Sequence, residues 1–204
     1  MKFLDIFLLP KELYRRLNED RTTLYLGIIL VGLRDVGLYL GNRMPEFFAG
    51  KSQGILLQNA AVVLGFILLI GLIDVIFFSY PLYDLMKFIK RRQEEPGLEV
   101  SVIKLMKVYI LANLVVTPID IVMSVVLTRI GDTSVNPLLV AVLQLVLLAT
   151  YFWYYAAITR GSSVLFNFRG VLKGWIFLIA LLYGDLLNLA FRFIYEKGLM
   201  VLLK

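Results

Sequence analysis

The chain has 204 residues, 60% of them hydrophobic, and carries 21 Lys and Arg against 15 Asp and Glu, a formal net charge of +6. Its mean hydropathy of +0.82 is far above that of soluble proteins, so we expect a polytopic membrane protein without a separate soluble domain. Cysteine and histidine are absent, which excludes disulfides, thiol nucleophiles, haem and imidazole metal sites, and the usual general base near neutral pH. We expect neither a cofactor nor nucleic-acid binding, because the basic residues flank apolar segments and build no domain of their own.

The first segment, residues 1–21, precedes a predicted span at about residues 22–40 and has an amphipathic pattern. Its apolar side chains share one helical face, and its basic side chains lie opposite. This pattern predicts a short helix in the plane of an anionic leaflet, with a solvated basic lead-in as the alternative. The apolar face holds Leu13, Tyr14 and Leu17, and the basic face holds Lys11, Arg15 and Arg16.

A second span is predicted at about residues 55–79, and the longest connector of the chain follows it. Apolar residues from Leu82 to Ile89 recur there at helical spacing, and Pro96 ends the segment. The pattern predicts a second interfacial amphipathic helix that contacts anionic lipid. Its basic residues are Lys87, Lys90, Arg91 and Arg92.

The third predicted span, at about residues 108–128, carries a proline and a carboxylate in its apolar part. Pro118 cannot donate to the carbonyl of Leu114, so we expect a kink and a free carbonyl there. A polar stripe runs along one face of this helix, and other helices must cover it. The stripe consists of Asn113, Thr117, Asp120 and Ser124.

Two more spans are predicted at about residues 138–158 and 174–195, which makes the fold class an all-α bundle of five spans with short interfacial helices. The aromatic cluster Tyr151–Tyr155 is typical of a belt at the membrane interface. Five spans place the termini on opposite sides. Lys and Arg are enriched before the first span and in the second and fourth connectors, so we expect a cytoplasmic N-terminus.

Ionisable residues at bilayer depth usually face the bundle interior and pair there. With a helical rise of ~1.5 Å, Asp35, Asp120 and Asp185 each lie ~17–20 Å from the cytoplasmic edge, in one layer. Arg34 lies at this level, and since adjacent helical residues diverge we expect it to pair with Asp120 or Asp185 rather than Asp35. The expected polar cluster is Arg34, Asp35, Asp120, Gln144, Asp185 and Asn188.

Two interpretations of this cluster stay open. It is either an interhelical network that fixes helix order, or a hydrated cavity that binds a cation, a proton or a polar head group. Any metal ion there would have only oxygen ligands, from Asp35, Asp120 and Asp185. We expect Asp74 and Asn113 to form a separate polar pair nearer the cytoplasm. The glycine pairs of the first two spans predict close helix packing, at Gly27 and Gly32 and at Gly65 and Gly71.

Four features resemble the Yip family of five-span membrane proteins, first described as interactors of Rab GTPases. They are the lead-in FLDIFLLPKELYRRLNEDR, the proline-bearing VYILANLVVTPIDIV, the end of the fourth span FWYYAAITRG, and five spans in about 200 residues. The resemblance implies a cytoplasmic N-terminus and roles in membrane organisation or trafficking through homo- or hetero-oligomers. The long polar N-terminal domain of eukaryotic members is not seen here, which favours a prokaryotic relative in a bacterial or archaeal cell membrane.

The first functional hypothesis is therefore a non-enzymatic membrane protein that organises membranes or protein partners. It would use its basic segments on anionic lipid and its spans on other spans. The second hypothesis is a small transporter or channel-like protein that binds its substrate at the intramembrane carboxylates. A dry, fully paired network would favour the first hypothesis, and a cleft that reaches the carboxylate layer would favour the second.

Overall fold

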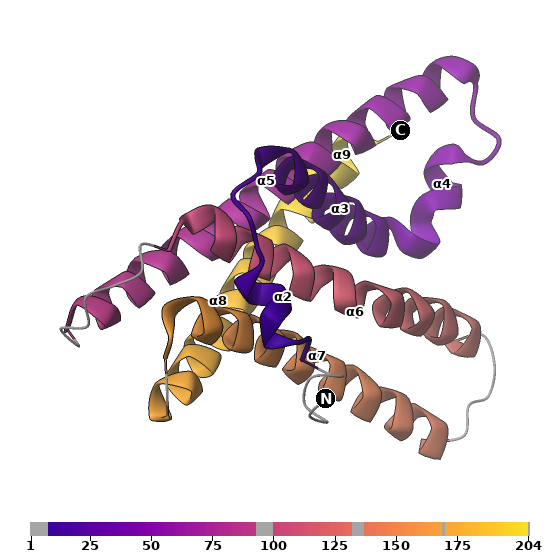
Figure 1. Cartoon of the computed structure of the whole chain (residues 1–204). Coiled ribbons are helices and arrows are strands. Elements are labelled where there is room, and N and C mark those ends of the chain that lie inside the picture. The colour runs from indigo at the N-terminus through magenta and orange to yellow at the C-terminus, as the bar shows by residue number, and fades with distance from the viewer. Residues whose placement is uncertain (1–7, 93–99, 132–136, 169, 204) are drawn as a thin grey trace.

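The computed structural model describes residues 8–92, 100–131, 137–168 and 170–203. The chain is an all-helical bundle in which five helices are long and apolar enough to cross a membrane (Figure 1). In chain order the elements are α2 (Lys11–Arg15), α3 (Arg21–Leu40), η1 (Gly41–Arg43), α4 (Met44–Phe48), α5 (Gln53–Arg92), α6 (Val102–Gly131), α7 (Pro137–Phe166), α8 (Val171–Ile194), η2 (Tyr195–Leu199) and α9 (Met200–Leu202).

The five long helices are α3, α5, α6, α7 and the α8–η2–α9 run, and each contains one of the five predicted spans. Consecutive spans run in opposite directions. We call the end of the bundle that holds the starts of α3, α6 and α8 the near end, and the opposite end the far end. The near end is the one that the sequence predicts to be cytoplasmic.

The largest difference from the sequence-based prediction is in α5. This helix runs without interruption through 40 residues, with Pro81 inside it, where we expected a span and a separate interfacial helix. At ~1.5 Å per residue it is ~60 Å long, about twice the ~30 Å hydrocarbon core. Its near-end extension stays helical because Leu82 and Met86 are buried in the core there.

Helices α3 and α5 approach each other most closely at two glycines. A methyl group built on Gly32 would stand 1.9 Å from the carbonyl oxygen of Ile67, and one on Gly71 would stand 2.2 Å from that of Ile28. Only residues without a side chain fit this crossing. The prediction of close packing is therefore confirmed for Gly32 and Gly71, whereas Gly65 has nothing within 4 Å.

In α6 the predicted polar stripe faces other helices. Asn113 is buried, and Thr117 donates a hydrogen bond of 2.7 Å to the carbonyl of Asn113 one turn earlier. Pro118 lies within the continuous helix, one residue after this contact. This bond satisfies the Thr117 hydroxyl within the helix, whereas the carbonyl that Pro118 leaves without its usual backbone donor is that of Leu114.

The apolar core divides into two parts along the bundle. The near-end cluster draws buried residues from α3, α5, α6, α7 and α8. The far-end cluster has its described members in α3, in α5 and in the segment from α8 to the C-terminus. The described members of this second core therefore include no residue of α6 or α7. Figure 1 shows these two helices running below α3.

The short helix α2 is held against α7 by one aromatic residue. Tyr14 is 1% exposed, and its hydroxyl donates to the carbonyl oxygens of Leu8 and Ala157 at 3.1 and 3.3 Å. The absence of a side chain at Gly161 makes room for its ring. Helix α2 is thus docked on the near end of the bundle through Tyr14 alone, while Leu13 and the basic residues Lys11, Arg15 and Arg16 are exposed.

Candidate functional site: a polar cavity between the two parts of the bundle

A cavity of about 1090 Å³ lies among α3, α5, α6, α7 and α8. Its walls come from all five long helices and from η2. On the α8–η2 wall the lining runs from Gly184 to Glu196, a rise of ~18 Å at ~1.5 Å per residue. The cavity therefore extends through about half of the ~30 Å apolar core.

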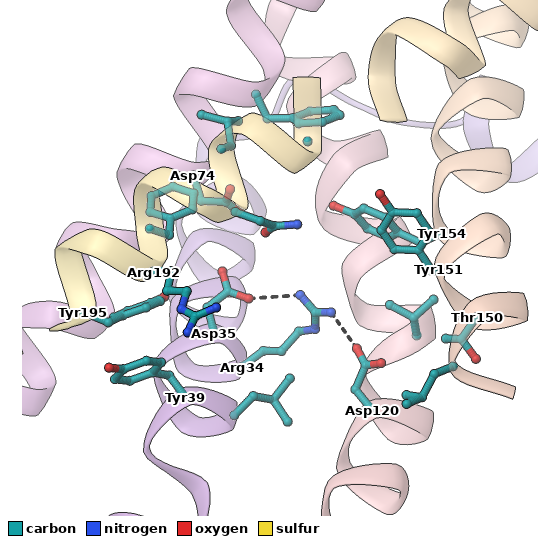
Figure 2. A pocket seen from close by; sticks show the side chains of 18 of the residues that line it. Arg34, Asp35, Tyr39, Asp74, Asp120, Thr150, Tyr151, Tyr154, Arg192 and Tyr195 are labelled. Atoms are coloured by element: carbon teal, nitrogen blue, oxygen red, sulfur yellow. Dashed lines mark hydrogen bonds and ion pairs between the residues drawn. The ribbon is translucent and has the colours of Figure 1, made fainter. Parts of the chain in front are cut away.

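Arg34 on α3 makes the central polar contacts of this cavity. Its Nη1 donates to Asn113 Oδ1 at 2.8 Å and to Asp35 Oδ1 at 3.0 Å, and its Nη2 donates to Asp120 Oδ2 at 2.5 Å. Figure 2 shows the guanidinium crossing the gap between Asp35 on one wall and Asp120 on the other. A planar group with several fixed donors is suited to such a bridge, and Arg34 ties α3 to α6.

Asp120 is thus one of the two partners that the sequence predicted for Arg34. The expectation that Arg34 would not contact Asp35 was wrong. Adjacent helical residues do point in different directions at Cβ, but the arginine side chain is long enough to turn its guanidinium back toward its neighbour. Each of the three side chains is about one-fifth exposed.

Asp74 on α5 lies in the same cavity rather than in a separate cytoplasmic site. It is 5% exposed and accepts a hydrogen bond of 2.6 Å from the hydroxyl of Tyr109. Asn113 donates to the carbonyl of Tyr109 and to the hydroxyl of Tyr154, both at 3.1 Å. Asp74 and Asn113 are therefore linked through Tyr109, and the supposed second pair is the inner end of the Arg34 network.

Asp185 differs from the other predicted members of the cluster. It is exposed on α8 and accepts a hydrogen bond from the hydroxyl of Tyr151, so it does not pair with Arg34. Gln144 and Asn188 do line the cavity, on α7 and α8. Five of the six predicted residues line one cavity: Arg34, Asp35, Asp120, Gln144 and Asn188. The sixth, Asp185, is hydrogen-bonded to the cavity-lining Tyr151.

The suggested ion site of three carboxylates is not formed. Asp35 and Asp120 both pair with Arg34, whereas Asp185 contacts Tyr151 instead. Among residues 8–92, 100–131, 137–168 and 170–203, no group of three or more His, Cys, Asp or Glu side chains is close enough to hold a metal ion.

The charges in the cavity are unevenly distributed along its depth. The inner part holds Arg34 with three carboxylates, from Asp35, Asp74 and Asp120, which leaves a formal surplus of negative charge. The far-end rim holds Arg43 and the exposed ion pair of Arg192 and Glu196, whose Nε–Oε1 distance is 3.0 Å. The cavity is therefore acidic inside and mixed in charge at its rim.

The sequence-based reasoning missed the tyrosines of the cavity wall. Tyr151, Tyr154 and Tyr155 were expected at the membrane interface, but all three line the cavity, and Tyr155 is 2% exposed. Gly184 on α8 makes room for the Tyr155 ring, since a methyl group there would stand 2.1 Å from its hydroxyl oxygen. A possible signal was the density of tyrosine at helical spacing on a span that also contains Gln144.

The basic residues predicted to contact anionic lipid lie on α2 and on the near-end extension of α5. Lys87 and Arg91 are exposed, Lys90 is half-buried, and Arg92 lies at the end of the described helix. Lys87 Nζ also stands 5.8 Å from the centre of the Tyr83 ring. Together with the exposed residues of α2, Lys87, Lys90 and Arg91 gather positive charge at the near end.

A buried lysine that was not predicted connects the near-end elements. Lys107 on α6 is 6% exposed, and its Nζ donates to Asn18 Oδ1 at 2.7 Å and to Thr23 Oγ1 at 2.6 Å. It therefore fixes the segment between α2 and α3 against α6.

No family model, no curated protein and no solved structure matches this chain.

Proposed function

We propose that the protein binds a positively charged solute in the cavity around Arg34 and acts as a small transporter or channel-like protein, without catalysing a reaction. The observation that carries this proposal is the depth of the cavity. It extends from the far-end rim to Asp74 and Tyr109 in the interior, and so reaches the carboxylate layer. A dry, fully paired network is the arrangement that would favour a purely structural role.

The charge balance supports a cation as the bound species. One oxygen each of Asp35, Asp74 and Asp120 is engaged by Arg34 or Tyr109. In a site of low dielectric constant, a surplus of carboxylate charge attracts a cation strongly.

The size of the cavity supports the same conclusion. A cavity of about 1090 Å³ is as large as the pockets that hold drug-sized ligands, which occupy ~300–1,000 Å³. A network that served only to fix helix order would not need this volume.

The test uses the purified full chain reconstituted in liposomes. Cation influx is measured for the unchanged protein, for Asp120→Asn and for Asp35→Asn, with Asp84→Asn on the exposed end of α5 as the matched control. We expect both cavity variants to reduce influx at least tenfold and the control to retain it. Thermal unfolding of each variant in detergent shows whether a loss of influx comes from loss of the fold. Unchanged influx together with lowered thermal stability in the cavity variants would overturn the transport proposal.

A role in membrane organisation, which the resemblance to the Yip family implies, is the second candidate. The observation in its favour is the group of exposed basic side chains on α2 and the α5 extension. Protein in phosphatidylcholine nanodiscs would be mixed with phosphatidylglycerol vesicles and sedimented. We expect neutralising Lys90, Arg91 and Arg92 to weaken association, more so at low salt, and neutralising Arg43 at the far end to leave it unchanged. Equal association of both variants would exclude this surface as a lipid contact.

A further inference from the structure

Aromatic rings form a large part of the cavity wall. On one side Tyr39 and Tyr195 stack with their ring centres 4.4 Å apart. On the other side the rings of Phe78, Tyr109, Tyr154, Tyr155 and Tyr151 follow one another, with neighbouring centres 4.2–6.1 Å apart. Figure 2 shows Tyr39 and Tyr195 facing Tyr151 and Tyr154 across the gap that Arg34 bridges. Aromatic rings therefore line the acidic interior on two sides.

One wall residue also has an unused polar group. Tyr195 is 6% exposed and lines the cavity, yet its hydroxyl has no hydrogen-bond partner in the part of the chain that the structure describes. The same holds for Nε of Arg34. A buried polar group without a partner is destabilising, so such groups usually meet a ligand or an ordered water molecule.

We infer that the cavity accommodates an organic ammonium group, held between the inner carboxylates and the tyrosine walls, with the Tyr195 hydroxyl as a polar contact for the same ligand. This inference rests on the proposed function and names the class of cation. The ammonium is either a free amine or the head group of a lipid such as phosphatidylethanolamine. Both sources present the same chemistry to the site.

Three observations favour an organic cation over a metal ion. Cations of this kind bind over aromatic faces within ~6 Å of the ring centre, whereas hard metal ions require oxygen ligands. The described residues hold no group of three acidic side chains around a single point. The cavity also has room for an organic molecule, while one inorganic ion would fill only a small fraction of about 1090 Å³.

The test measures binding to the purified full chain in detergent by calorimetry and by thermal stabilisation. The probes are propylammonium chloride and tetramethylammonium chloride, compared with sodium and potassium chloride at the same ionic strength. We expect binding and an increase in melting temperature with the ammonium salts only. For the lipid source, nanodiscs that contain phosphatidylethanolamine are compared with nanodiscs of phosphatidylglycerol. Lower apparent affinity for the free amines in the former would identify the lipid head group as a competitor.

Two matched substitutions place the ligand in the cavity. Tyr195→Phe keeps the ring and removes the unpartnered hydroxyl, and we expect propylammonium affinity to fall about fivefold with no loss of thermal stability. Tyr39→Leu removes an aromatic face, and we expect both ammonium salts to bind about three- to thirtyfold more weakly. Tyr25→Phe, on the exposed outer face of α3, serves as the control and should change nothing.

The outcomes separate this inference from the proposed function. If sodium or potassium binds and the ammonium salts do not, the cavity is a cation site but the class inferred here is wrong. If no cation binds and influx is also absent, both are wrong. Ammonium binding that is unchanged by Tyr195→Phe and Tyr39→Leu would move the ligand out of this cavity and overturn the inference.

Discussion

The bridge made by Arg34 gives the sharpest prediction about stability. Arg34 and Asp120 are each about one-fifth exposed, and Arg34 makes three hydrogen bonds to groups on α3 and α6. Arg34→Met removes all three and leaves two neighbouring carboxylates without their cation. Breaking one partner of a buried ion pair costs about 3–5 kcal/mol, and we expect a loss of that size in the free energy of unfolding.

Asp120→Asn keeps an oxygen acceptor for the guanidinium and loses the negative charge, so we expect a smaller loss of about 1–3 kcal/mol. The two changes should not add. Once Asp120 is neutral, removing Arg34 leaves one carboxylate fewer without a partner, and the double variant should be about 1–3 kcal/mol more stable than the sum of the single losses predicts.

The assay is reversible unfolding in mixed detergent and SDS micelles, followed by circular dichroism, for the unchanged protein, both single variants and the double variant. Arg192→Met is the control, because it breaks an ion pair in which the arginine side chain is 75% exposed and the glutamate 49%. It should change stability by no more than about 0.5 kcal/mol. Additivity of the Arg34 and Asp120 changes to within about 0.5 kcal/mol would refute the bridge.

Three further predictions concern other parts of the fold. Gly71→Ala should lower the free energy of unfolding by about 1–3 kcal/mol, because its methyl group would clash with a backbone oxygen of α3. Gly65→Ala, where the added methyl group has open space, should leave the free energy of unfolding unchanged. Equal effects of the two substitutions in an unfolding assay would contradict the close crossing of α3 and α5. Backbone N–H groups in the first turn of α3 hold the pKa of Asp20 below its ordinary value of 3.8, so this cap stabilises α3 above that pH and is lost as the pH falls through the lowered pKa. A carboxyl carbon titration by NMR with a midpoint at or above 3.8 would exclude the cap. Tyr14→Phe should cost about 1 kcal/mol and speed proteolysis of the α2 region, whereas unchanged cleavage would show that the Tyr14 hydroxyl does not hold α2 on α7.

Much of the polar cluster could be anticipated from positions along the chain. Helical rise is nearly constant, so the depth of Asp35 and Asp120 follows from the distance to the start of each span. The cost of an isolated charge in hydrocarbon then requires a partner such as Arg34. Asp185 was placed at a suitable depth, but its rotation about the axis of α8 turns it toward Tyr151 instead. The depth of a residue in the membrane follows from its position along its own helix, whereas the direction in which its side chain points depends on how the helices pack against one another.

The extent of α5 and the role of the tyrosines show the same limit. A span ending near residue 79 and a separate interfacial helix were predicted, yet burial of Met86 at the near end sustains one helix through Pro81. Tyr155 belongs to a pattern typical of membrane interfaces, and it is buried because α8 presents Gly184 opposite. In each case a contact between distant segments outweighs a local preference.

The amino-acid sequence alone determined that the protein is helical and crosses the membrane with five apolar segments, because segment length and hydropathy act locally and need no knowledge of neighbours. It also predicted that Arg34 pairs with a carboxylate on another helix, either Asp120 or Asp185. Only the tertiary structure decided that the five long helices leave a cavity around Arg34. Apolar side chains that face lipid and those that face protein are chemically alike, so the sequence does not show which helix faces pack together. Shape complementarity decides this, through contacts such as the Gly32–Gly71 crossing.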